Sequence, residues 1–228
     1  PVSEDNCLVP STTCHVRSVL GIAAWGVLAV RPAEVHAAAV LARYSHRPTQ
    51  NVVKCLYHFC SYLLDHASEV LNITDDGSPI FQSVVDASWA NDPATSRSWF
   101  GYALLWGGCP FAFRSKLEPC VALSSRDAEA IACVFVVRAM IGTLVLLNEL
   151  GLVDDPSILP LQCGVDNQAT IDGTVSDKIH KDSRFMAMRL RWLREIVKNG
   201  YVAYGTYIPG QMWRMCLLIA AAGRSRSF

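Results

Sequence analysis

Three acidic residues stand where predicted secondary-structure elements end or begin. Asp86 follows the apolar run 81–85, Asp166 follows the alternating run 159–165, and Glu129 lies near the start of a predicted long helix. Carboxylate oxygens are preferred ligands of hard divalent cations, so these three side chains would form a metal site if they converged. Spacing alone leaves a second interpretation open, in which the three acids only flank their elements.

The helix that carries Glu129 has sequence signals at both ends. Ser124 is a suitable N-cap, and Asp127 three residues later completes a capping box. Gly151 is a suitable C-cap, so the helix is expected from residue 125 to about residue 150. The neighbours of Glu129 on its helix face are apolar, which is unusual for an acid that only solvates a surface.

The pattern of residues 80–208 predicts a mixed α/β domain. Gly107 and Gly108 separate two aromatic-rich runs and indicate a tight hairpin, because both positions can adopt positive φ. Apolar residues at helical spacing predict a short helix over residues 167–173 and another that starts near Met186 and ends at Asn199-Gly200. The expected strands are 80–86, 98–106, 109–115, 159–165 and 201–208.

The first third of the chain has helical patterning. Residues 1–15 are polar and are expected to form a tail, whereas residues 16–66 are expected to be helical. Pro32 is suited to the first turn of one helix, and residues 52–63 carry the apolar stripe of the next. Residues 72–79 form the clearest loop and the expected domain boundary.

Four motifs occur together in one order along the chain. They are Val85-Asp-Ala-Ser-Trp-Ala90, Arg97-Ser-Trp-Phe-Gly-Tyr102, Val121-Ala-Leu-Ser-Ser-Arg-Asp-Ala-Glu-Ala-Ile-Ala132 and Val165-Asp-Asn-Gln-Ala-Thr-Ile171. None is specific by itself. In this order and with these gaps, they resemble the ribonuclease H domain of copia-type retrotransposon polyproteins.

This resemblance implies a fold and a division of the chain. Residues 79–213 are expected to form an α/β, ribonuclease H-like domain, in which helices flank a mixed five-stranded sheet. Residues 16–21 with Arg31-Pro32 are similar to the region that joins polymerase to ribonuclease H. Residues 1–70 are therefore expected to be a helical connection remnant of a reverse transcriptase, and residues 214–228 a divergent tail.

The resemblance also assigns chemistry to the three acids. Asp86, Glu129 and Asp166 are expected to be catalytic and to ligate Mg²⁺, with Asp86 as the bridging ligand. Two such ions about 3.5–4 Å apart can activate water and neutralise the leaving oxygen in phosphodiester hydrolysis. The implied activity is Mg²⁺-dependent endonucleolytic cleavage of the RNA strand of an RNA–DNA hybrid.

One family feature is missing from the sequence. The family has a fourth carboxylate after its last strand, but no acid follows Glu195 in this chain. A second metal ion is therefore expected to bind more weakly. The alternative is a degenerate, catalytically inactive relic that at most binds nucleic acid.

A basic helix face is the candidate surface for the nucleic acid. The formal net charge is zero, so any nucleic-acid binding must come from a local patch. In residues 178–198, a helix would align four basic residues that could contact phosphates, namely Arg184, Arg191, Arg194 and Lys198. The other interpretation is an ordinary solvated helix face.

Three further residues are candidates for nucleic-acid contact or proton transfer. Trp89 and Trp99 could stack on the substrate, but packing is the favoured role. His180 could shuttle protons near a metal-bound water, but it does not match the family's motif and is expected on the surface.

The cysteine pattern and the hydropathy indicate the cellular location of the protein. The nine cysteines form no CxxC pair, which favours buried thiols in a reducing compartment. Residues 130–147 are long and apolar, but Arg138 near the middle favours a buried core helix over a membrane span. The N-terminus has no secretory signal pattern. An intracellular protein is expected, with no membrane association and no evident obligate protein partner.

Overall fold

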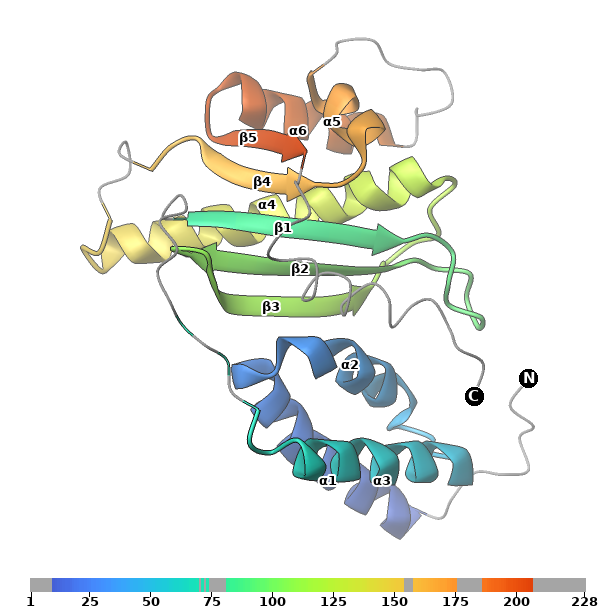
Figure 1. The fold of residues 1–228 in the computed structure, drawn as a ribbon. Helices are drawn as coiled ribbons and strands as arrows, with labels where there is room; N and C mark the ends of the chain where they lie inside the picture. The colour runs from blue at the N-terminus through green and yellow to red at the C-terminus, as the bar shows by residue number, and fades with distance from the viewer. Residues whose placement is uncertain are drawn as a thin grey trace. The chain divides into compact units, whose positions relative to one another are not determined.

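The computed structural model describes residues 10–69, 71, 73, 81–153, 158–175 and 186–206. The chain divides into two compact units, residues 1–72 and 73–228 (Figure 1). This division falls at the start of the predicted loop 72–79. The interpretation of the first unit as a reverse transcriptase remnant stays a prediction.

The first unit is helical. It contains α1 (Pro10–Val30), the 3₁₀ turn η2 (Pro32–Glu34), α2 (Val35–Tyr44) and α3 (Gln50–Asp65). The expectation of a tail up to residue 15 is wrong, because α1 already begins at Pro10. Thr49 caps α3 by accepting a hydrogen bond from the Val52 N–H.

Arg31 lies between α1 and η2 and forms hydrogen bonds with the segment that follows α3. Its guanidinium donates to Glu69 Oε2 over 3.1 Å and also to the carbonyl oxygen of His66. A second, longer ion pair of 3.8 Å joins it to Glu34, which is buried. A charge that is largely removed from water is favourable only with such partners, so Arg31 fixes the end of α3 beside the α1–α2 connection.

The second unit is a five-stranded mixed sheet covered by helices. The strands are β1 (Phe81–Ser88), β2 (Trp99–Trp106), β3 (Cys109–Leu117), β4 (Leu161–Val165) and β5 (Val202–Thr206), in the order β3-β2-β1-β4-β5. β1, β2 and β3 pair antiparallel, whereas β4 runs parallel to both β1 and β5. Gly107 and Gly108 close the β2–β3 hairpin with φ of 54° and 78°, which confirms the predicted turn.

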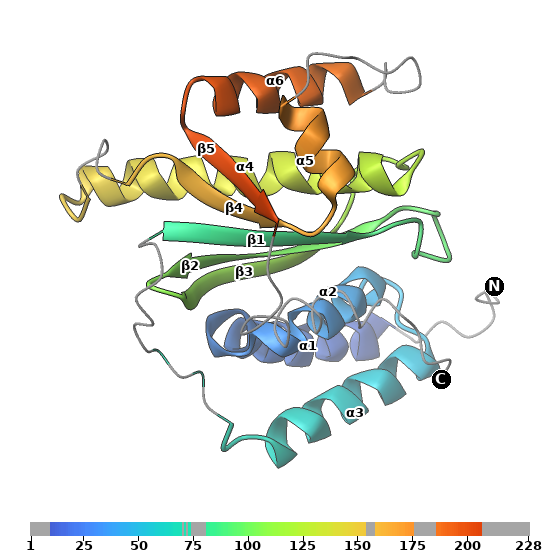
Figure 2. The same cartoon turned by 45° about the horizontal axis from the view of Figure 1, so that its top comes forward.

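Three helices pack on one face of this sheet: α4 (Ser125–Glu149), α5 (Gln168–Val175) and α6 (Ala187–Lys198) (Figure 2). The core between helices and sheet holds Val136 and Met140 of α4, Ile171 of α5 and Leu193 of α6. Ser83 of β1 donates its hydroxyl to the Met140 sulfur. Removal of this apolar surface from water is what holds the layers together.

The long helix α4 is a core helix. By length and composition alone it could cross a membrane, and it is the one such helix in the described part of the chain. Its residues Ala132, Cys133 and Val136 are completely buried and belong to the core packed on the sheet. This burial supports the core-helix interpretation, whereas length and composition are weak evidence for a span.

Candidate metal centre

Strand pairing places the two aspartates side by side. Val85 of β1 pairs with Val165 of β4 in parallel register. Asp86 and Asp166 each follow one of these paired residues, so they lie next to each other at the same end of two neighbouring strands. The expectation that Asp86 ends its strand is wrong, because β1 continues to Ser88 and pairs with β2 beyond Asp86.

Glu129 reaches the aspartates from the first turns of α4. Ser124 caps the helix by accepting a hydrogen bond from the Asp127 N–H over 3.1 Å, which confirms the predicted N-cap. The backbone N–H of Ala87 donates to Oε1 of Glu129 over 3.3 Å. The residue after Asp86 therefore holds the Glu129 carboxylate against the sheet.

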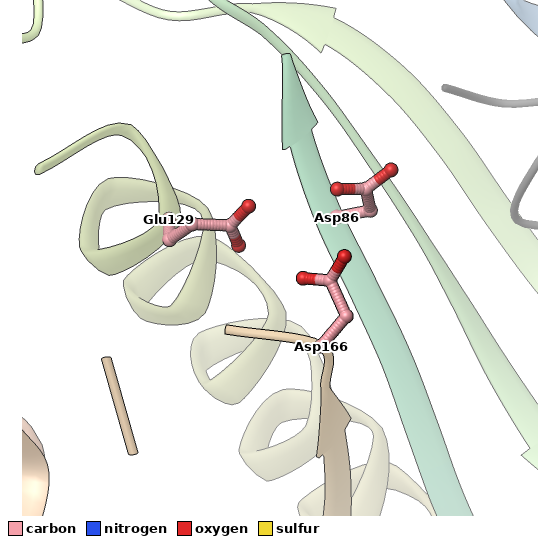
Figure 3. A group of neighbouring side chains, drawn as sticks. All are labelled: Asp86, Glu129 and Asp166. Atoms are coloured by element: carbon pink, nitrogen blue, oxygen red, sulfur yellow. The ribbon is translucent and has the colours of Figure 1, made fainter. Parts of the chain in front are cut away.

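The three acids meet in one group, which Figure 3 shows with the side chains of Asp86, Glu129 and Asp166 directed toward one another. One oxygen of each lies within 4.8 Å of the others. Glu129 is buried, Asp86 is half-buried and Asp166 is exposed, so the group opens to solvent on the Asp166 side. Oε2 of Glu129 is buried and has no hydrogen-bond partner among the described residues.

Crowding of the carboxylates changes their protonation. Burial, together with the charges of Asp86 and Asp166, raises the pKa of Glu129 to about 9, and the Ala87 hydrogen bond opposes this only in part. At neutral pH the metal-free group therefore holds a proton that a divalent cation would displace. An all-oxygen donor set with an unpartnered buried oxygen fits a hard cation such as Mg²⁺.

A buried acid near this group was missed by the sequence reasoning. Glu118 directly follows β3 and is fully buried. Burial raises the pKa of Glu118 to about 8, and a hydrogen bond with the Ser98 side chain opposes this increase only in part. Its charge also contributes weakly to the raised pKa of Glu129. Glu118 does not belong to the group of three acids.

Three of the four candidate nucleic-acid-binding residues lie on α6. Arg191 and Lys198 are exposed on α6. Arg194 is half-buried and donates its Nε–H to the Gly173 carbonyl oxygen of α5 over 2.9 Å. Arg184 and His180 lie outside the described residues.

The two tryptophans have different environments. Trp99 is 8% exposed, so packing is its role. Trp89 is 52% exposed, and its indole N–H donates to the Ala122 carbonyl oxygen just before α4. Trp89 thus links the segment after β1 to the lead-in of the helix that carries Glu129.

Two solved structures are similar to this chain. Ribonuclease H1 from Halobacterium salinarum NRC-1 has 14% sequence identity, with 64% of this chain and 98% of that chain covered at a TM-score of 0.43. A foamy viral protease-reverse transcriptase, described as dRH and in complex with double-stranded DNA, has 12% identity and a TM-score of 0.51. That match covers 92% of this chain and 34% of the viral chain. The protein has an α/β fold of the ribonuclease H-like class, as predicted.

Proteins with similar sequences include transposon polyproteins of plants. No protein-family model matches the chain. The retrovirus-related Pol polyprotein from transposon TNT 1-94 of Nicotiana tabacum is 29% identical over 182 residues, which is 80% of this chain and 13% of the polyprotein. The polyprotein from transposon RE1 of Arabidopsis thaliana is 25% identical over 171 residues, or 75% of this chain and 11% of the polyprotein.

A shorter relative shares part of the same region. The protein named secreted RxLR effector protein 161 of Plasmopara viticola is 32% identical over 116 residues, which is 50% of this chain and 81% of that protein. The curated relatives of this chain thus include retrovirus-related Pol polyproteins from plant transposons, in agreement with the resemblance stated from the sequence. The chain spans only a small part of the two plant polyproteins, about an eighth or less of each.

Proposed function

We propose that this chain hydrolyses the RNA strand of RNA–DNA hybrids in a reaction that depends on Mg²⁺. Its ribonuclease H-like fold and its retroelement relatives support this class of activity. The observation that carries the proposal is the convergence of Asp86, Glu129 and Asp166, whose oxygens lie within 4.8 Å of one another. A cluster of this kind repels itself at neutral pH unless a cation or a proton neutralises it.

The residues of the site have separable roles in this proposal. We assign Asp86 as the bridging ligand, as the resemblance to ribonuclease H domains implies. Glu129 is held in place by the Ala87 N–H, so its carboxylate is pre-positioned and loses little freedom when it binds a cation. Asp166 is exposed and lies at the open side, where the substrate's phosphate would approach.

Bound Mg²⁺ would polarise the scissile phosphate and lower the pKa of an attacking water. We assign no fourth carboxylate, because no acid follows Glu195 in the sequence and no other described acid joins the group of three. A second ion would therefore bind more weakly than the first.

Substrate recognition would rest on the sugar-phosphate backbone. The exposed Arg191 and Lys198 and the half-buried Arg194 form a basic face on α6 that supports phosphate contacts. Hybrid recognition would depend on duplex shape and on the 2′-hydroxyl more than on base sequence. The buried thiols of Cys133 and Cys163 are compatible with an intracellular, reducing compartment, which we also propose.

The missing fourth acid favours a second candidate function. A chain that keeps the fold and the basic face without turnover would act as a hybrid-binding relic. The two candidates make different predictions for one variant. In a catalytic protein, Asp86→Asn abolishes cleavage, whereas in a relic the parent protein and Asp86→Asn are equally inactive.

The decisive experiment is a cleavage assay with the purified chain. An RNA–DNA hybrid labelled on the RNA strand is incubated with Mg²⁺ or with EDTA. We expect RNA cleavage only with Mg²⁺, and a loss of at least about 100-fold in Asp86→Asn. Asp172→Asn is the matched control, because Asp172 is an exposed acid on α5 outside the group of three. Absence of Mg²⁺-dependent cleavage by the parent chain would refute the catalytic proposal.

A further inference from the structure

Two arginines from different helices meet at Gly173 of α5. The Nη2 atom of Arg126, in the first turn of α4, lies 2.6 Å from the position that a Cβ atom on Gly173 would occupy. Arg194 of α6 donates its Nε–H to the carbonyl oxygen of the same glycine over 2.9 Å. The missing side chain at position 173 is therefore what makes room for the Arg126 guanidinium.

The arrangement of the helices makes this meeting possible. α4, α5 and α6 each contact the other two (Figure 2). Gly173 is buried, whereas its neighbour Asp172 is exposed, and the Asp172 Oδ1 accepts a hydrogen bond from the Gln168 side chain. The glycine thus presents its backbone to the two arginines, and the adjacent acid is engaged elsewhere.

Neither positive charge is neutralised by the part of the chain that the structure describes. Neither Arg126 nor Arg194 forms an ion pair with a described residue. The Nε of Arg126 is buried and has no hydrogen-bond acceptor there. Two like charges held against one residue repel each other, and a bound anion would convert that repulsion into attraction.

We propose that Arg126 and Arg194 form a phosphate-binding site for the backbone of the nucleic acid, a proposal that rests on the proposed function. Guanidinium groups bind phosphate oxygens through paired, charge-assisted hydrogen bonds, so the chemistry of the pair fits a phosphodiester. Arg126 lies three residues before Glu129 on α4, which is about 4.5 Å along the helix axis. The site therefore adjoins the metal centre and continues toward the exposed Arg191 and Lys198 of α6.

Binding measurements test the site independently of cleavage. The affinity of an RNA–DNA hybrid is measured by fluorescence anisotropy at several salt concentrations, with every variant made in the non-cleaving Asp86→Asn chain. We expect Arg126→Ala to weaken binding about tenfold and to reduce the slope of log K against log salt by about 1.

Arg138→Ala is the matched control for charge. Arg138 is exposed on the same helix, twelve residues or about 18 Å beyond Arg126. The substitution removes the same charge from the protein but leaves the arginine pair intact. We expect its affinity to stay within about twofold of the parent.

Gly173→Ala tests the geometry without a change of charge. The added Cβ would meet the Arg126 Nη2 at 2.6 Å and displace the guanidinium, which is the far end of a flexible side chain. Alanine also favours a helix over glycine, so the melting temperature should stay equal or rise. We expect the hybrid to bind roughly three- to tenfold more weakly although the fold is at least as stable.

The outcomes separate the two proposals. If Arg126→Ala and Gly173→Ala bind like Arg138→Ala at every salt concentration, the phosphate site is refuted, even if the parent chain cleaves hybrids. If Arg126→Ala and Gly173→Ala bind the hybrid more weakly but the parent chain does not cleave it, the phosphate site is supported and the catalytic proposal is refuted. If the Asp86→Asn chain does not bind the hybrid at any salt concentration, the phosphate site is refuted, and the cleavage assay with the parent chain alone decides the catalytic proposal.

Discussion

The backbone N–H of Ala87 donates a hydrogen bond to Oε1 of Glu129 over 3.3 Å, and this bond joins the strand that carries Asp86 to the helix that carries Glu129. It leaves the other oxygen of Glu129 without a partner in the described part of the protein. Oε1 of Glu129 is thus held by the Ala87 hydrogen bond, and Oε2 is available to bind a cation. The role of the Glu129 charge can be tested with glutamine, which removes the charge and keeps the shape of the side chain.

Glu129→Gln is predicted to stabilise the metal-free protein and to abolish its response to Mg²⁺. The glutamine amide oxygen can still accept the Ala87 N–H, but the crowding of negative charge is removed. Because the pKa of Glu129 is raised to about 9, the gain at pH 7 is on the order of 2–3 kcal/mol. Urea unfolding with EDTA and with Mg²⁺ measures both effects. Equal stabilisation of parent and variant by Mg²⁺ would contradict the assignment of Glu129 as a ligand.

The stability of the metal-free protein is predicted to fall as pH rises. In the unfolded chain Glu129 loses its proton near pH 4.5, whereas in the folded protein it keeps the proton up to about pH 9. Between these values the folded state binds more protons, so the free energy of unfolding decreases by up to about 1.4 kcal/mol per pH unit. Unfolding curves in EDTA at pH 5, 7 and 9 measure this slope. Glu129→Gln should flatten it, and an unchanged slope would show that other groups cause it.

Glu118→Gln is predicted to preserve Mg²⁺-dependent cleavage while it alters stability. Burial raises the pKa of Glu118 to about 8, so its contribution to stability is also lost as pH rises from about 4.5 to 8. The variant should gain on the order of 3–4 kcal/mol at pH 8 relative to the parent. Cleavage should stay within a few-fold, because Glu118 is outside the group of three acids. If cleavage disappears while the variant remains folded, Glu118 acts in place of the missing fourth acid.

Ser124→Ala is predicted to destabilise the helix that positions Glu129. The Ser124 hydroxyl accepts the Asp127 N–H over 3.1 Å, and loss of such a cap costs about 1 kcal/mol. Ser125→Ala is the matched control, since Ser125 is exposed in the next position and does not cap the helix. Urea unfolding of both variants measures the difference. Equal stability of the two would contradict a capping role for Ser124.

Local signals predicted much of the second unit. The Gly107–Gly108 turn was predictable because the required positive φ depends on the residues themselves. The Ser124 cap was predictable for a similar reason, because a short hydroxyl side chain competes well for a helix N-terminal N–H. Strand ends were less predictable. β1 continues to Ser88 because Ser88 pairs with Trp99 of β2, and this register depends on the contact between the two strands.

By itself the sequence determined which residue types could do chemistry and, through the resemblance of four ordered motifs, the fold class. Only the tertiary structure decided that Asp86 and Asp166 lie side by side, because this depends on the parallel register of β1 with β4. Only the tertiary structure revealed the burial of Glu118 and the meeting of Arg126 and Arg194 at Gly173. Burial and convergence are set by contacts between distant segments, and no local pattern encodes them.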